Sequence, residues 1–260
     1  MTNLKIELKG NKRVYFASDF HLGLSSLSRQ EEIDRENKII KWLSAIEHHS
    51  QAIFLVGDIF DFWFEYKHAI PKGFVRFLGK IAHLTDHGIP VYFFTGNHDM
   101  WMFRYFKEEI GVEIFDKPIE LIVNDTNMLI GHGDGLGPGD TMYKIQKKVF
   151  TNKMMQWLFR WLHPDLGIGL AKKWSNSSRL RKAGHDEEFM GEKEFLVQYC
   201  KQKESENHHD YYIFGHRHLP LEININGKSK YINLGEWVNN FTYGEFDGNS
   251  FILKKFEDNS

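Results

Sequence analysis

The stretch VYFASDFH, residues 14–21, decides how the rest of the chain is interpreted. Its first four residues, Val14–Ala17, are apolar or aromatic and predict a short buried β-strand. The strand leads into Asp19 and His21, which share one face of an extended backbone because strand side chains alternate with a period of two. A single Asp-x-His pair is more often structural, capping a helix or making a hydrogen bond in the core. Its meaning therefore depends on the rest of the sequence.

Other short apolar runs also predict buried strands. They are Ala52–Val56, Pro90–Thr95, Asn127–Ile130, Tyr211–Phe214 and Tyr231–Leu234. Segments with apolar residues near helical spacing, Ser28–His48 and Phe74–Asp86, lie between the early strands. The second half of the chain has more strand, as in Glu120–Ile130 and Leu221–Leu234. We therefore expect an α/β (α+β) fold in which sheets pack together with helices outside.

The length of 260 residues suits one large domain, and we predict a single domain over residues 1–260. Between Gly139 and Asn207 the strand pattern disappears and about three helical patterns replace it. We interpret residues 140–207 as a helical cap inserted in this domain.

Composition narrows the functional classes. The formal charge of −2 gives no reason to expect a nucleic-acid partner, although a local basic stretch keeps a nucleic-acid hydrolase among the alternatives. The single cysteine, Cys200, excludes an intramolecular disulfide framework and fits a reducing compartment. The N-terminus lacks a secretory pattern and no apolar segment is long enough to span a bilayer, so we expect a cytoplasmic protein.

Four more predicted strands end in polar motifs like the first. These motifs are Gly57-Asp58-Ile59-Phe60-Asp61, Gly96-Asn97-His98-Asp99, Gly131-His132-Gly133-Asp134 and Gly215-His216-Arg217-His218. Each has an ordinary explanation alone: Asp58 suits a helix N-cap, Gly-Asn is a common turn, and a buried histidine is usually a hydrogen-bonded core residue. Five such motifs at strand ends are improbable by chance, and strand ends converge at one crevice in α/β sheets. Mixed Asp, His and Asn ligation favours Mn²⁺, Fe²⁺ or Zn²⁺.

In this order the motifs DxH, GDxxD, GNHD, GHxD and GHxH resemble those of the calcineurin-like metallophosphoesterase family, and they extend from Asp19 to His218. The resemblance implies a sandwich of two mixed sheets flanked by helices, with two divalent metal ions, Mn²⁺ being expected. Two cations would stabilise the attacking and leaving oxygens of a phosphoryl transfer. By the same resemblance one ion is held by Asp19, His21, Asp58 and His218, and the other by Asp58, Asn97, His132 and His216. His98, oriented by Asp99, is expected near the leaving oxygen, as a proton donor or a stabiliser of charge.

The segments FHLG and GDIFDFW and the insertion before GHRHLP resemble the UDP-2,3-diacylglucosamine pyrophosphatase branch of this family, which serves lipid A biosynthesis. The resemblance implies hydrolysis of UDP-2,3-diacylglucosamine to UMP and 2,3-diacylglucosamine 1-phosphate, with the cap receiving the acyl chains. The residues expected to bind this substrate are Asn97, His98, Asp140, Tyr143, Ser178, Arg179 and Lys182. One departure concerns His98, because the best-known members of the branch carry arginine there. A broader phosphodiesterase or phosphatase acting on another lipid or nucleotide diphosphate is therefore the alternative enzyme.

The predicted cap is rich in apolar residues interrupted by basic ones, from Lys147 to Leu162. Such a helix fits a lipid-facing surface, and we expect peripheral contact with the cytoplasmic face of the inner membrane and no obligate protein partner. The alternative is a helix whose apolar face packs on the body. The basic residues from Lys172 to Lys182 suit phosphate or sugar hydroxyls, or equally a solvated helix face. A lipid-binding scaffold that has kept the fold is the non-enzymatic alternative, and the complete ligand set speaks against it.

Overall fold

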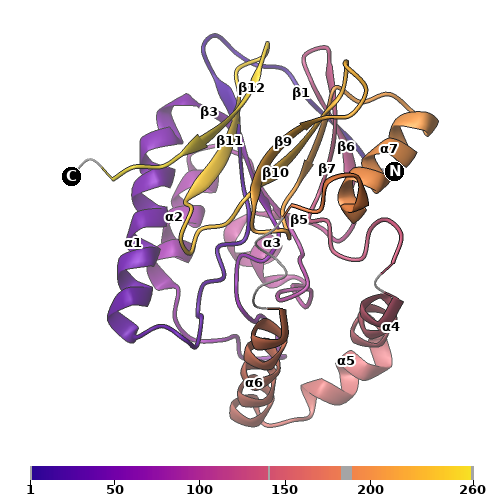
Figure 1. Cartoon of the computed structure of the whole chain (residues 1–260). Helices are drawn as coiled ribbons and strands as arrows, with labels where there is room; N and C mark the ends of the chain where they lie inside the picture. The colour runs from indigo at the N-terminus through magenta and orange to yellow at the C-terminus, as the bar shows by residue number, and fades with distance from the viewer. Residues whose placement is uncertain (1, 140, 183–188, 259–260) are drawn as a thin grey trace.

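The computed structural model describes residues 2–139, 141–182 and 189–258. Two six-stranded mixed sheets form its centre (Figure 1). The first sheet has the order β1 (Asn3–Ile6), β6 (Ile119–Val123), β7 (Thr126–Gly131), β8 (Tyr211–Phe214), β10 (Lys230–Leu234) and β9 (Pro220–Asn224). The second has the order β12 (Phe251–Lys255), β11 (Thr242–Phe246), β2 (Arg13–Ala17), β3 (Ser50–Val56), β4 (Val91–Phe94) and β5 (Glu113–Phe115).

The alternation of side chains along β2 shows how the layers are built. Val14 and Phe16 belong to the core between the two sheets, together with Phe54 of β3 and Ile130 of β7. Tyr15 and Ala17 point the other way, into a second core with the flanking helices. Strands buried on both faces read as continuous apolar runs, which is why the sequence predicts them well.

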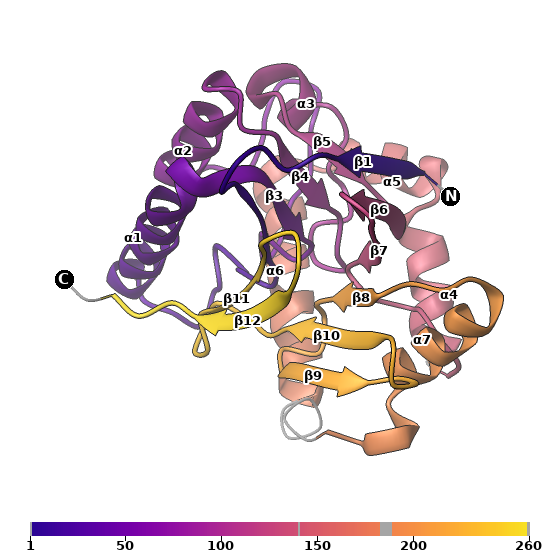
Figure 2. The ribbon, with the colours of Figure 1, turned by 90° about the horizontal axis from the view of Figure 1, so that it is seen from above.

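Helices cover the outer faces of both sheets (Figure 2). Those beside the second sheet are α1 (Arg29–Ile46), followed by the 3₁₀ turn η1 (Glu47–His49), then α2 (Val75–Asp86) and α3 (Tyr105–Ile110). Helix α1 begins after Ser28, whose side chain accepts a hydrogen bond from the backbone N–H of Glu31 while Glu31 reaches back, a capping box that fixes the start of the helix. On the first sheet, α7 (Phe195–Glu206) packs through Leu196, Val197 and Cys200.

The expected α/β sandwich is confirmed, and all six predicted buried strands are present. Strands β1, β5, β11 and β12 were not predicted from the sequence. Three of them, β1, β5 and β12, lie at sheet edges. Edge strands are half exposed, so they lack the continuous apolar run on which the prediction depends.

The segment predicted as a cap contains α4 (Thr141–Phe150), α5 (Lys153–Arg160), α6 (Pro164–Lys182), the 3₁₀ turn η2 (Gly191–Lys193) and α7. Helices α4 to α6 lie together at one end of the molecule, away from the sheets, whereas α7 packs on a sheet (Figure 1). The division into one domain with an insertion at 140–207 stays a prediction. Within the described ranges, no helix combines the length and apolar character needed to cross a membrane.

Candidate metal centre

The five motifs follow strands whose carboxyl ends point the same way. Strands β2, β3 and β4 are parallel to one another, as are β7 and β8. The loops after these strands therefore meet at one edge of the sandwich. All seven predicted ligands lie in these loops: Asp19, His21, Asp58, Asn97, His132, His216 and His218.

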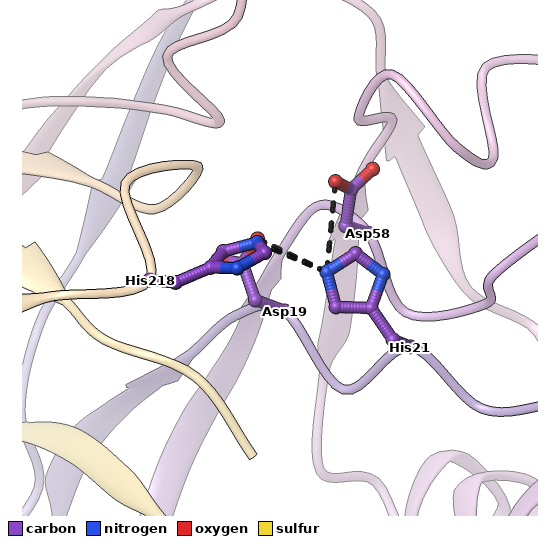
Figure 3. A group of neighbouring side chains, drawn as sticks. All are labelled: Asp19, His21, Asp58 and His218. Carbon is purple, nitrogen blue, oxygen red and sulfur yellow. Dashed lines mark hydrogen bonds and ion pairs between the residues drawn. The ribbon is translucent and has the colours of Figure 1, made fainter. Parts of the chain in front are cut away.

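The structure brings Asp19, His21, Asp58 and His218 into one group whose ligand atoms lie within 4.8 Å of one another. Figure 3 shows the imidazoles of His21 and His218 beside the two carboxylates. Nε2 of His21 lies 3.1 Å from Nε2 of His218 and 3.9 Å from Oδ2 of Asp58. Such an arrangement directs two ring nitrogens and two carboxylates toward one small volume.

The oxygen Oδ1 of Asp19 tests whether this volume suits a cation. The atom is buried, and within the described part of the chain it accepts no hydrogen bond. It lies 3.2 Å from Nε2 of His218 and 3.7 Å from Nε2 of His21. A buried carboxylate oxygen is normally paired, so an oxygen left without a hydrogen bond among imidazole nitrogens fits a divalent metal ligand.

A second group contains Asp58, His132 and His216, so Asp58 belongs to both groups. Nε2 of His132 lies 3.3 Å from Oδ2 of Asp58 and 3.4 Å from Oδ1 of Asn97. The other ring nitrogen, Nδ1, is 2.9 Å from the carbonyl oxygen of Val56. That contact holds the ring so that Nε2 faces the group, as outer hydrogen bonds commonly do for metal-binding histidines.

Asp58 and the histidines around it stabilise one another's charged forms. Burial opposes the ionisation of Asp58, but the neighbouring His132, His98 and His21 outweigh it and hold the pKa of Asp58 well below its usual range. Burial likewise opposes protonation of His132, yet the carboxylate of Asp58 raises the pKa of His132 to about 10. The pocket thus stabilises an anionic Asp58 when a positive charge lies beside it.

Backbone strain is concentrated at these residues. Asp19, His21, Asp58, His216 and His218 all have left-handed φ angles, between 45° and 69°. This region is costly for residues with a side chain, and strained backbone of this kind clusters at functional sites.

The glycines that precede the motifs have a steric role. A Cβ atom at Gly57 would collide with His132, one at Gly96 with Asp58, and one at Gly215 with Asp19. The candidate ligands therefore pack directly against glycine backbone, which explains why glycine recurs in the motifs.

His98 lies beside both groups. Its backbone N–H donates to Oδ1 of Asp58 at 2.8 Å, and its ring centroid is 4.9 Å from that of His21. The prediction that Asp99 orients His98 needs correction. The carboxylate of Asp99 is fully buried and accepts hydrogen bonds from the backbone N–H groups of Gly96, Ile59 and Phe60. Asp99 thus ties the second motif to the third.

Two residues that the sequence prediction did not single out lie beside His98 instead. Nδ1 of His98 is 3.1 Å from the carbonyl oxygen of Asp61 and 3.6 Å from its Oδ1. The hydroxyl of Ser175, on α6, lies 3.2 Å from the same ring nitrogen and donates to Oδ1 of Asp61 at 3.1 Å. Asp61 stands in the quoted GDIFD motif and was open to prediction, whereas no sequence signal marks Ser175.

The remaining predicted substrate residues are placed only in part. Tyr143 lies on α4, donates its hydroxyl to Asp134, and has its ring 6.5 Å from that of His216. Lys147 pairs with the same carboxylate, Nζ to Oδ2, at 2.6 Å. Asp140 lies outside the described residues. Ser178, Arg179 and Lys182 belong to α6, and their side chains are likewise outside the described part.

Comparison with known proteins agrees with this arrangement. The model of the calcineurin-like phosphoesterase family matches residues 12–220. A protein of Porphyromonas gingivalis named UDP-2,3-diacylglucosamine hydrolase is 32% identical over 95% of this chain and 98% of its own length. A protein of Histophilus somni with the same name is 28% identical over 92% of this chain and 98% of its own length. Among solved structures, the phosphoesterase Yfce from E. coli covers 95% of both chains at 14% identity, with a TM-score of 0.47, too low to support an inference.

Proposed function

Because the chain belongs to the calcineurin-like phosphoesterase family, we propose that it hydrolyses the pyrophosphate bond of UDP-2,3-diacylglucosamine, giving UMP and 2,3-diacylglucosamine 1-phosphate. One observation carries the choice of substrate. The relatives bearing that enzyme name align along nearly the whole chain, so the similarity is not confined to the metal motifs. The proposed step belongs to lipid A biosynthesis.

Two divalent cations, with Mn²⁺ as the proposed ion and Fe²⁺ or Zn²⁺ as alternatives, would be held by the two groups that share Asp58. When bound, they would activate water and stabilise charge on the phosphoryl oxygens. The chain supplies the rest. His98 is the group proposed to act at the leaving oxygen, and Asp61 and Ser175 hold its Nδ1 side.

The side chains of helices α4 to α6 support the proposal of an amphiphilic substrate. Phe159 packs inward, 4.8 Å from the rings of both Phe64 and Trp101. Many other large apolar side chains from α4 to α6 are exposed, over 39% to 74% of their surface. They are Ile145, Val149, Met154, Trp157, Leu158, Trp161, Leu162, Leu166 and Leu170.

Packing on the body therefore accounts for one face of α5, and the exposed side chains are the ones that we propose face lipid. Exposed large apolar side chains that gather on a few helices are typical of interaction sites, and the basic residues Lys153 and Arg160 stand at the two ends of α5. We propose that this surface contacts the cytoplasmic face of the inner membrane, where the acylated substrate resides.

The test is an assay with purified, Mn²⁺-loaded protein. UDP-2,3-diacylglucosamine is expected to yield equimolar UMP and 2,3-diacylglucosamine 1-phosphate. Cleavage of a generic aryl phosphodiester without release of UMP would refute this substrate and favour the broader phosphodiesterase that His98 suggests. No cleavage of either compound, with metal bound, would favour a lipid-binding scaffold.

A further inference from the structure

A buried ion pair lies beside the fifth metal motif. Nε of Arg217 is 2.7 Å from Oε1 of Glu194, and the two side chains are 6% and 0% exposed. Withdrawing both charges from water carries a large cost, and removing one partner leaves the other charge buried and uncompensated. Arg217 is the residue between the candidate ligands His216 and His218, so the pair fixes the middle of that loop.

The loop has an unfavourable backbone conformation. His216 and His218 have φ angles of 69° and 54°. Two contacts hold the loop to other parts of the fold: the backbone N–H of His216 donates to Oδ2 of Asp19 at 3.0 Å, and the carbonyl oxygen of His218 accepts a hydrogen bond from the side-chain amide of Asn240 at 3.3 Å. A conformation that is costly for both histidines needs such external contacts to persist.

The other partner lies at the start of a helix that packs on the first sheet. Glu194 immediately precedes α7, which packs on the first sheet through Leu196 and Val197. The next residue, Phe195, has its ring 6.1 Å from that of His216. The ion pair therefore links two segments. One is the point where the chain re-enters the body after helices α4 to α6, and the other is the loop that carries His216 and His218.

We propose that Glu194 and Arg217 are positioning residues that hold His216 and His218 in their metal-binding geometry. His218 belongs to the first ligand group and His216 to the second, so the pair acts on both cation positions. This inference rests on the proposed metal centre.

The test measures binding of Mn²⁺ to metal-free protein by titration calorimetry. Glu194→Gln is expected to weaken binding about 10- to 100-fold, the usual effect of losing a residue that orients metal ligands. Glu192→Gln is the control, because Glu192 is 81% exposed and pairs with Lys201 on the surface, and it should bind Mn²⁺ like the wild type. An affinity of Glu194→Gln for Mn²⁺ equal to that of the wild type would overturn the positioning role.

A double variant separates positioning from folding. Glu194→Leu with Arg217→Met replaces the pair with apolar side chains, which usually preserves stability. The thermal midpoint of the metal-free double variant is expected near that of the wild type, while Mn²⁺ binding stays at least about tenfold weaker. Recovery of wild-type affinity would mean that the pair only stabilises the fold. Absence of Mn²⁺ binding by the wild type itself would instead overturn the metal centre, and the positioning role with it.

Discussion

The hydroxyl of Ser175 lies 3.2 Å from Nδ1 of His98, although the two residues are 77 positions apart in the sequence. Ser175 is carried by α6 and is 6% exposed, so a helix of the predicted cap reaches the edge of the metal centre. The contact gives a physical route by which docking of this helix would orient the group proposed to act at the leaving oxygen.

Ser175→Ala is therefore expected to lower kcat about tenfold and to leave Mn²⁺ affinity unchanged, because the variant removes a neighbour of His98 and no candidate ligand. Steady-state kinetics with the proposed substrate measure the effect. Thr151→Ala is the control, because Thr151 also lies in the predicted cap, directly after α4, but its hydroxyl is exposed. A kcat equal to that of the wild type would show that Ser175 does not act on His98.

Asp99 is expected to contribute to stability rather than to proton transfer. Asp99→Ala leaves three buried backbone N–H groups without their acceptor, and we expect the free energy of unfolding to fall by about 3 kcal/mol. Urea denaturation of the metal-free protein measures this loss. A stable Asp99→Ala protein whose only defect is a shifted pH profile would restore the role that the sequence suggested.

The difference between Asp99 and Asp61 shows where sequence reasoning ends. Asp19, His21 and the glycine-led motifs could be predicted, because strand alternation and parallel strand ends place them together without knowledge of the loops. Asp61 and Asp99 are both carboxylates in such motifs, and only the path of the turns decides which one reaches His98. Ser175 could not be predicted at all, because its hydrogen bond to Asp61 depends on how α6 lies against the body across 114 residues of sequence.

Two exposed tryptophans, Trp157 on α5 and Trp161 directly after it, give a prediction about membranes. Trp157→Ala with Trp161→Ala removes side chains that are 55% and 74% exposed, and we expect at least about tenfold weaker partitioning to vesicles containing anionic lipid. Vesicle sedimentation measures the partitioning. Ile252→Ala is the control, because Ile252 is 45% exposed but lies on β12, away from α5 (Figure 1). Equal partitioning of the tryptophan variant and the wild type would contradict the proposed membrane contact.

Hydrogen bonds to the carboxylate of Glu204, near the C-terminal end of α7, predict how the stability of the fold changes with pH. Burial opposes ionisation of Glu204, but hydrogen bonds from His208, Tyr212 and the backbone N–H of His209 outweigh it and lower the pKa of Glu204 from 4.5 to about 2. Tyr212 donates at 2.6 Å and lies on β8, so the carboxylate ties α7 to the first sheet.

Since the folded pKa of Glu204 is depressed, its stabilisation is fully present above the ordinary pKa and is lost as pH falls through the folded value. We expect Glu204→Gln to cost about 1–2 kcal/mol at pH 7, with the difference from wild type shrinking between pH 5 and about pH 2. Urea midpoints of the wild type and of Glu204→Gln, taken at pH 7 and at pH 3, measure this difference in stability. A difference that stays constant with pH would show that the charge of Glu204 does not stabilise the fold.

The central claim is that Asp58 is shared by two metal positions, and the number of Mn²⁺ ions bound per chain tests it most directly. Titration calorimetry is expected to give two ions for the wild type and for the control Asp86→Ala, which alters an exposed carboxylate at the end of α2. Asp58→Ala is expected to lose both ions together with hydrolysis. A single ion in the wild type, or unchanged Mn²⁺ binding by Asp58→Ala, would contradict the shared-ligand account.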